Sequence, residues 1–203
     1  MIILGIETTT SQFSVALSDN GMISQVNLNV GFQHSQNLIP TIDLLLKQTK
    51  KKLEDINIVA VSTGPGSFTG IRIGIALAKT LAQFLNIKSI GISTLDALAI
   101  KFSYNNSFVL PIVDALNEDV IVRLYKIVNF KPRVFSKIKI LKVSQLKSFL
   151  LKFRLSNENV YCVGDGAIKY SEKLKYLNLP NPIDALPEAK NICLLAMKFF
   201  KKA

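Results

Sequence analysis

Near the N-terminus, a carboxylate, two hydroxyls and a glycine-rich turn have the residue types and spacing that could bind a nucleotide. Glu7 is followed by two threonines, and the turn at 63–69 is rich in glycine. Glycine lets the main chain approach a ligand closely, and the free N–H groups at the start of the following helix favour an anion. The residues that the sequence nominates for a nucleotide or anion site are Glu7, Thr8, Thr9, Gly64, Pro65, Gly66, Ser67, Phe68, Thr69, Gly70 and Arg72.

The spacing of the glycines excludes two common phosphate-binding loops. Gly70 is followed by an Ile-Arg pair rather than by the Lys-Ser/Thr of a Walker A loop, and the spacing from Gly64 to Gly70 is one residue too long for a dinucleotide fingerprint. Glu7 and Asp114 could instead hold a hydrated metal ion. The competing interpretation is that these two carboxylates only cap strand ends or turns.

His34 is the only histidine in the sequence. A single histidine cannot form a His-x3-His metal pair, so we expect it to be a residue of a helix start or of an interface. Ser67 or Thr69 could act as a nucleophile only with His34 as its base, and the sequence does not fix where that ring lies.

The elements that must position these residues are a buried strand at 58–61 and a helix at 70–84, joined by the glycine turn. One side of this helix carries almost no side chain, because small residues recur every four positions at Gly70, Gly74, Ala78 and Ala82. Another helix is expected at 33–48. A helix as apolar as 70–84 either lies in a core or shares its surface between a core and a partner.

The two halves of the chain look like copies of each other. Segment 6–17 matches segment 113–124 at a constant offset of 107 residues, and 61–66 matches 161–166 at an offset of 100 residues. Two matches in the same order indicate internal duplication. A ligand cleft is then expected at the carboxyl ends of the strands.

The boundary between the copies is expected at 105–106, which gives lobes at 1–105 and 106–203. In the second lobe we expect strands at 108–113, 120–128, 133–139 and 160–163, and helices at 143–153 and 187–201. The fold class is therefore α/β.

The chain has 203 residues and a formal net charge of +11, and the excess is concentrated in one segment. Residues 120–157 contain ten basic residues and no acidic one. Such a segment either attracts nucleic acid or an acidic protein, or is an ordinary solvated face. No apolar run approaches the length of a membrane helix, the N-terminus does not read as a signal peptide, and both cysteines are expected to be free, buried thiols in a reducing cytoplasm.

The run from Val61 to Gly74 resembles the hallmark of the bacterial TsaB (YeaZ) family. Further segments fall in the family's order, at 3–17, 34–40, 92–99, 113–115, 164–166 and 187–189. The resemblance implies two duplicated ribonuclease-H-like lobes of the actin and Hsp70 type, with mixed sheets flanked by helices. The sequence departs from the family pattern in the second lobe, where Leu116 stands at a position that is often arginine in the family. This difference weakens any nucleotide role of that turn.

The resemblance also implies a function. Members of the family are non-catalytic scaffold subunits in the synthesis of threonylcarbamoyladenosine (t6A) in tRNA, and they pair with TsaD, the transferase. A TsaE-like ATPase joins the pair, no cofactor is required by the scaffold itself, and ATP or ADP could sit at the interface of the complex. The tRNA would be contacted indirectly or through 120–157. We also expect a cytoplasmic location, no membrane association and a homodimer when the partner is absent.

Helices 34–48 and 70–86 are the implied surface for the transferase. The expected interface residues are His34, Leu38, Ile39, Ile42, Leu45, Leu46, Ile71, Gly74, Ile75 and Ala78. On this hypothesis Ile75→Glu or Leu38→Glu abolishes pairing and leaves the lobe folded. The alternative function is an actin-like ATPase or phosphotransferase that binds nucleotide between the lobes, with Glu7 and Asp114 around ATP and Mg²⁺.

Overall fold

The computed structural model describes residues 1–29, 31, 34–103, 107–155, 160–182 and 184–200. The chain forms two compact units. Unit 1 contains Met1–Ala97 and Pro187–Ala203, and unit 2 contains Leu98–Leu186. Each unit is a sheet with helices packed on it, so the predicted α/β class is confirmed. The predicted boundary at 105–106 lies outside the described residues.

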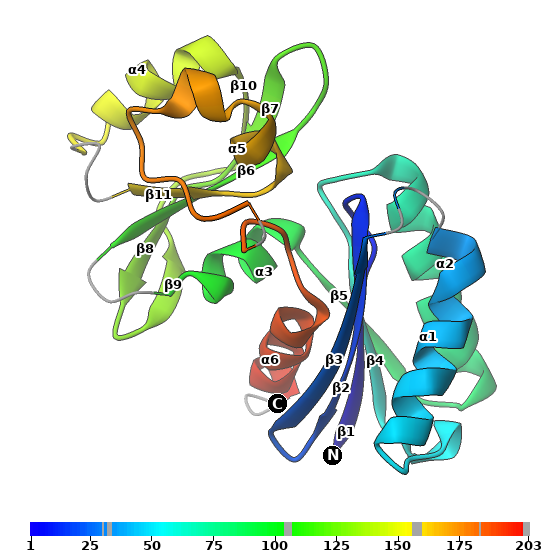
Figure 1. Ribbon diagram of the computed structural model, residues 1–203. Helices are drawn as coiled ribbons and strands as arrows, with labels where there is room; N and C mark the ends of the chain where they lie inside the picture. The colour runs from blue at the N-terminus through cyan, green and yellow to red at the C-terminus, as the bar shows by residue number, and fades with distance from the viewer. Residues whose placement is uncertain (30, 32–33, 104–106, 156–159, 183, 201–203) are drawn as a thin grey trace. The chain divides into compact units, whose positions relative to one another are not determined.

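Unit 1 has a five-stranded sheet in the order β3-β2-β1-β4-β5 (Figure 1). Strand β1 is antiparallel to β2 and parallel to β4. The strands span Ile2–Glu7 (β1), Gln12–Asp19 (β2), Met22–Asn29 (β3), Ile58–Ser62 (β4) and Lys88–Ile92 (β5). Helices α1 (His34–Gln48) and α2 (Phe68–Phe84) cover one face of this sheet, and a short 3-10 helix lies at Leu53–Asp55.

Strands β1, β2 and β4 of unit 1 are buried on both faces, with alternate side chains pointing to opposite sides. In β1, Leu4 and Ile6 pack on the side of α1 and α2, whereas Ile3 packs on the other side. In β4, Val59 and Ala60 divide between the two faces in the same way. The sheet therefore needs a second cover beyond α1 and α2.

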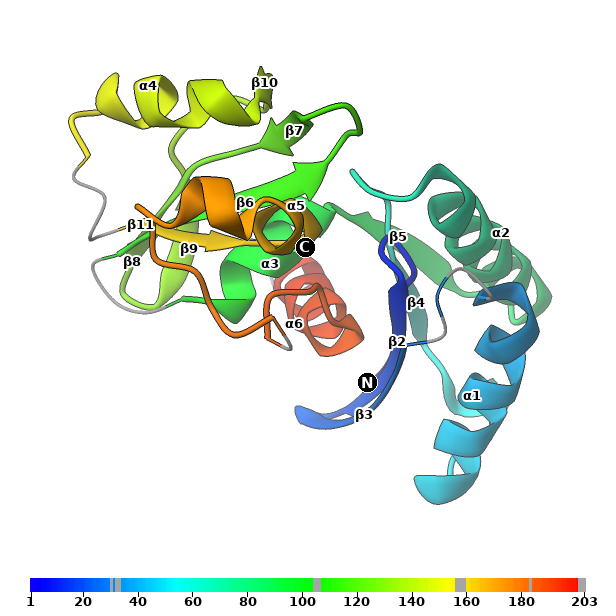
Figure 2. The same ribbon diagram turned by 45° about the horizontal axis from the view of Figure 1, so that its top comes forward.

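That cover is the last helix, α6 (Ala189–Phe200), which the sequence had assigned to the second lobe. Ala189 donates its N–H to Ser14 Oγ at 2.7 Å, and Cys193 lies so close to Gly5 that a Cβ on Gly5 would be 2.6 Å from Cys193 Sγ. Figures 1 and 2 both show α6 on the face of the sheet opposite α1 and α2. The assignment of 187–203 to the second lobe is wrong, because the apolar face of α6 completes the core of unit 1.

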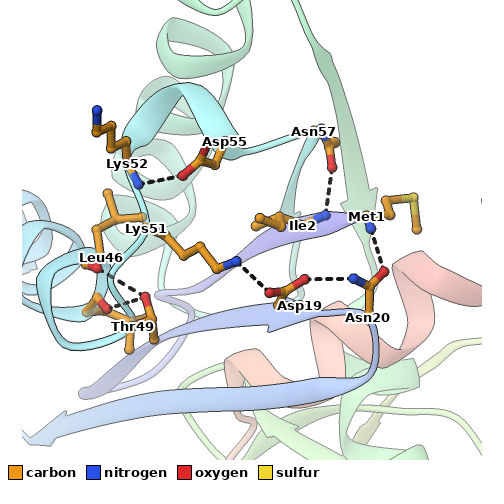
Figure 3. A network of polar contacts seen from close by, with 11 residues as sticks. Met1, Ile2, Asp19, Asn20, Leu46, Thr49, Lys51, Lys52, Asp55 and Asn57 are labelled. Carbon is orange, nitrogen blue, oxygen red and sulfur yellow. Dashed lines mark hydrogen bonds and ion pairs between the residues drawn. The ribbon is translucent and has the colours of Figure 1, made fainter.

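Polar contacts fasten the N-terminal edge of unit 1 (Figure 3). Lys51, just after α1, forms an ion pair with Asp19 at 2.7 Å, and the Met1 amino group donates to Asn20 Oδ1 at 2.7 Å. The Ile2 N–H donates to Asn57 Oδ1 at 2.7 Å, which ties β1 to the residue that precedes β4. These contacts hold the start of β1 to the β2–β3 turn and to the residue before β4, and they hold the segment after α1 to the end of β2.

Unit 2 has a six-stranded sheet that is built around β6 (Phe108–Asp114). Strands β7 and β8 pair with successive parts of β6, and β11 is parallel to it. The remaining elements are α3 (Thr94–Lys101), which leads into the unit, β7 (Asp119–Val122), β8 (Tyr125–Val128), β9 (Lys131–Val134), β10 (Lys139–Lys142), α4 (Leu146–Leu151), β11 (Val160–Val163), α5 (Asp165–Lys169) and the 3-10 helices Val143–Gln145 and Ser171–Leu174.

Two predicted strands of unit 2 are each two strands. The run 120–128 divides at residues 123–124, because β7 pairs with β10 and β8 pairs with β9. The predicted strand 133–139 divides into the end of β9 and the start of β10. The apolar runs are long enough for one strand, and only the sheet pairing reveals the division.

The repeated order of elements is confirmed, but its residue register is not constant. Glu7 lies opposite Ser14, whereas Asp114 lies opposite Val120, one position short of the partner that the offset of 107 residues predicts. The turn after Asp114 closes early, through the Ala115 N–H to Asp119 O bond of 2.8 Å. Among the described residues, no helix has the length and apolar character that crossing a membrane requires.

Candidate functional site

Glu7 lies at the end of β1 and is completely buried. Its Oε1 accepts hydrogen bonds from the Thr9 N–H at 2.7 Å and the Thr9 hydroxyl at 2.6 Å. Its Oε2 has no hydrogen-bond partner among the described residues. Burial raises the pKa of Glu7, and the hydrogen bonds from Thr9 offset this only in part. The carboxyl group is therefore held in an environment that favours its protonated form.

The glycine turn packs directly on the two threonines that follow Glu7. The Ser67 N–H donates to Thr9 O at 2.7 Å, and the Thr8 hydroxyl donates to Gly70 O at 2.8 Å. A Cβ on Gly66 would lie 2.5 Å from Thr9 O, and one on Gly70 would lie 1.9 Å from Thr8 O. The structure thus brings the predicted residues together, and their glycines serve the close approach of two turns of the same chain.

Thr94, which the sequence did not nominate, belongs to the same cluster. Its N–H donates to Gly64 O at 2.9 Å, and its hydroxyl lies 3.4 Å from the Thr9 hydroxyl. The cis peptide bond between Gly64 and Pro65 lies in this turn. The signal that could have found Thr94 is its position directly after β5, the strand next to β4.

The first turn of α2 carries Ser67, Phe68 and Arg72 at its surface. Ser67 caps the helix by accepting the Gly70 N–H at 3.2 Å, so this N–H is already bonded within the chain. The Arg72 guanidinium lies 3.9 Å from the centre of the Phe68 ring, and Phe68 and Thr69 are both exposed. A cation and an aromatic ring are thus presented together beside the helix start.

His34 is buried at the start of α1. Its Nε2 lies 2.8 Å from Thr10 O, and its ring meets the Phe13 ring edge-on with 5.6 Å between centres. Burial lowers the pKa of His34, which favours the neutral ring. Within this chain His34 is a residue of the core of unit 1, as 1% exposure shows.

The predicted interface residues divide between the core and the surface of unit 1. Ile39 is 63% exposed, and Ile71 and Ile75 are partly buried. The others are buried within the unit itself, namely His34, Leu38, Ile42, Leu45, Leu46, Gly74 and Ala78. Leu38 is only 1% exposed, so the expectation that Leu38→Glu leaves the lobe folded is wrong, because that change buries a carboxylate in the core.

The small-residue stripe of α2 faces the sheet of its own unit. A Cβ on Gly74 would lie 2.4 Å from Thr8 Oγ1 and 3.3 Å from Val61 Cγ2. The stripe therefore serves the core of unit 1. The exposed residues of α2 are Phe68, Thr69, Arg72, Ala76, Lys79, Thr80, Gln83 and Phe84, of which Phe84 is 75% exposed.

Asp114 at the end of β6 is the counterpart of Glu7, and its charge is matched within unit 2. Lys169 Nζ lies 2.6 Å from Oδ2, and the Tyr170 hydroxyl donates to Oδ1 at 2.8 Å. Partial burial raises the pKa of Asp114, but the bonds from Lys169 and Tyr170 outweigh it and lower the pKa overall. A metal ion at Asp114 would compete with Lys169 for Oδ2. Among the described residues, no group of three or more His, Cys, Asp or Glu is placed to hold one.

Comparisons with known proteins decide the family. Residues 28–193 match the family model described as TsaD, tRNA N6-adenosine threonylcarbamoyltransferase. The tRNA threonylcarbamoyladenosine biosynthesis protein TsaB of Buchnera aphidicola subsp. Schizaphis graminum is 33% identical over an alignment of 195 residues, and the alignment covers 92% of this chain and 91% of that protein. The chain belongs to the TsaB (YeaZ) family.

Solved structures confirm the fold. YeaZ from Pseudomonas aeruginosa superposes with a TM-score of 0.84 at 24% identity, over 99% of this chain and 92% of that one. The ROK hexokinase from Thermus thermophilus superposes over all of both chains with a TM-score of 0.51 at 10% identity. The fold is thus the actin-like one that the TsaB resemblance implied, and the TsaB family places the chain in the biosynthesis of threonylcarbamoyladenosine in tRNA.

Proposed function

We propose that this chain is a non-catalytic scaffold subunit of the t6A machinery that pairs with a TsaD-like transferase through α1 and α2. The observation that carries the proposal is the apolar surface of these helices in a chain of the TsaB family. Ile39, Leu44, Phe68 and Phe84 are 63%, 47%, 66% and 75% exposed. Large exposed apolar residues are typical of the centre of a protein interface.

The environments of His34 and Asp114 favour a non-catalytic role. The single histidine is buried against Phe13 and bonded to Thr10, and the Asp114 carboxylate is neutralised by Lys169. In isolation the same apolar surface would pair with a second copy of the chain. The proposal extends to a TsaE-like ATPase, to ATP or ADP at the interface of the complex, and to a cytoplasmic location.

The test is co-elution of the chain with the TsaD-like transferase of the same organism in size-exclusion chromatography. Modification of tRNA is then measured with and without the chain. We expect the two proteins to co-elute and modification to require both. Separate elution, together with full modification in the absence of this chain, would contradict the scaffold role.

Two variants locate the surface. Ile39→Glu places a charge in the proposed interface, and Met22→Glu makes the same kind of change at the tip of the β2–β3 hairpin, where Met22 is 76% exposed. We expect Ile39→Glu to abolish co-elution and Met22→Glu to leave it intact, with both variants folded by circular dichroism. If the two variants co-eluted with the transferase to the same extent, the result would contradict a role of α1 in the interface.

A further inference from the structure

A groove in unit 2 lies between strand β10 and helix α4. Its volume is about 420 Å³. Figures 1 and 2 both show α4 beside the end of β10. The groove is lined by Lys139, Leu141, Gln145, Ser148, Phe149, Lys152 and Phe153.

The walls of the groove differ in chemistry. Leu141 and Phe153 are partly buried and form the apolar surface, and the Phe153 ring meets edge-on the ring of Phe149, a core residue with 7% exposure, with 5.2 Å between centres. The Phe153 ring also lies 5.5 Å from that of Phe135, so these rings form one aromatic cluster. Two exposed lysines, Lys139 and Lys152, stand at the sides. The groove thus combines an aromatic floor with cationic walls.

Lys139 and Lys152 of the groove belong to a larger set of exposed basic residues that form no ion pair within the described residues. Within the part of unit 2 that the structure describes, Lys142 is paired with Asp119 at 2.9 Å. The exposed basic residues of segment 120–157 that form no ion pair within the described residues are Lys126, Lys131, Arg133, Lys137, Lys139, Lys147, Lys152 and Arg154.

We propose that the groove between β10 and α4 binds a single-stranded segment of RNA, with a base against Phe153 and its phosphates on Lys139 and Lys152. Lys137, just before β10, and Lys147, in α4, add two exposed cations on the elements that border the groove, and a cluster of cations suits a polyanion. Aromatic side chains accept any base, because every base has a π face, and cations beside them bind the backbone. The inference rests on the proposed function for the identity of the RNA, which is the tRNA that the family modifies.

Polar side chains at one end of the groove could contact the edge of a bound base. Gln145 Oε1 accepts the Lys142 N–H at 3.0 Å, which fixes the orientation of its amide. The Ser148 hydroxyl donates to Gln145 O at 3.1 Å and can still accept a bond. An acidic protein segment could use the lysines in the same way, but it would not need the aromatic floor.

The experiment measures binding of a fluorescently labelled RNA stem-loop to the full chain, without the transferase, by anisotropy at several salt concentrations. Lys139→Ala with Lys152→Ala removes two phosphate contacts, and we expect the slope of log K against log salt to fall by about 1.4. Phe153→Leu keeps an apolar side chain but removes the ring, and we expect binding to weaken about 5-fold or more. The matched control is Lys50→Ala with Lys52→Ala in unit 1, where both residues are exposed.

Three results would overturn the proposal. These are absence of RNA binding at about 50 mM salt, an equal loss in the Lys50 and Lys52 control, and RNA binding that Phe153→Leu leaves unchanged while polyglutamate displaces the RNA at equal charge. The last result would assign the surface to an acidic protein. Because RNA binding is measured on the isolated chain and co-elution is measured with the transferase, failure of this inference and failure of the scaffold role are separate results.

Discussion

Gly70→Ala is the sharpest test of how the glycine turn packs in unit 1. The new methyl group would lie 1.9 Å from Thr8 O, a main-chain atom of the turn that follows β1. A main-chain oxygen cannot move aside without moving the turn, and this turn is also bonded to Ser67 through Thr9 O. Gly74→Ala, one helical turn later, points its methyl group mainly at a side-chain atom, Thr8 Oγ1, at 2.4 Å.

The expected magnitudes follow from these contacts. Overpacking typically costs about 1–3 kcal/mol, and a contact this short with main chain should lie at the upper end. Displacement of Gly70 also weakens the 2.8 Å bond from the Thr8 hydroxyl, which costs about 1 kcal/mol more. Alanine gains about 1 kcal/mol over glycine inside a helix. The net loss is about 3 kcal/mol for Gly70→Ala and about 1 kcal/mol or less for Gly74→Ala.

The assay is urea unfolding of the full chain, followed by circular dichroism, for both variants in the wild type and in Thr8→Ala. Removing the threonine hydroxyl removes the atom that the methyl group of Gly74→Ala meets, so this change should become neutral or stabilising in that background. The cost of Gly70→Ala should persist at about 2 kcal/mol or more, because the main-chain oxygen remains. This contrast separates a main-chain contact from a side-chain contact.

The reasoning fails if Thr8→Ala rescues Gly70→Ala, because the contact would then involve the side chain. It fails equally if Gly70→Ala and Gly74→Ala cost the same in the wild type. The urea m-value should also stay constant across the series, since each comparison assumes that the unfolded state is unchanged.

Three further predictions concern titratable and thiol groups. Because the pKa of Asp114 is lowered in the folded state, the contribution of Asp114 to stability is present above its unfolded pKa and is lost as pH falls through the folded pKa. Lys169→Met should therefore make the loss of stability below about pH 4 shallower in urea titrations. An unchanged dependence of stability on pH in this acid range would contradict this. Burial raises the pKa of Glu7, so the contribution of Glu7 to stability is present below its unfolded pKa and is lost as pH rises through the folded pKa. Glu7→Gln should therefore gain stability over the wild type as pH rises above about 4.3. A difference in stability between variant and wild type that stays constant with pH would refute this. Cys162 and Cys193 are buried, and burial raises the pKa of both thiols, that of Cys193 to about 12. An aromatic disulfide reagent should react with these thiols only when the chain unfolds. Rapid labelling of the native chain would disprove their burial.

Local features of the sequence predicted the part of the site that is close in sequence. The apolar run before the glycine turn and the four-residue spacing from Gly70 to Ala82 were sufficient to place β4, the turn and α2. They also predicted a close approach along that stripe, which the contacts with Thr8 confirm. What this pattern could not give was the partner in the close approach, because periodicity identifies a face and not what lies against it.

Long-range pairing accounts for the features that the sequence did not predict. Helix α6 packs on unit 1 through residues such as Cys193, which lies against Gly5 of β1, and these two residues are 188 positions apart in the sequence. The partnership of Asp114 with Lys169 joins residues 55 positions apart, and no local pattern marks it. Leu38 and Ile39 are neighbours in one helix, yet one is buried and the other exposed, and this distinction needs the orientation of α1 on its sheet.

The two corresponding carboxylates, Glu7 and Asp114, are held in different ways in the two units. In unit 1, Glu7 is buried, one of its oxygens has no hydrogen-bond partner among the described residues, and burial raises the pKa of its carboxyl group. In unit 2, Asp114 stays ionised, but Lys169 and Tyr170 occupy its oxygens. A catalytic pair would need both carboxylates ionised and open to a cation. The repeat therefore keeps an acid at the end of each first strand, bonded to Thr9 through one oxygen in unit 1 and ion-paired with Lys169 in unit 2, and both arrangements agree with the proposed scaffold role.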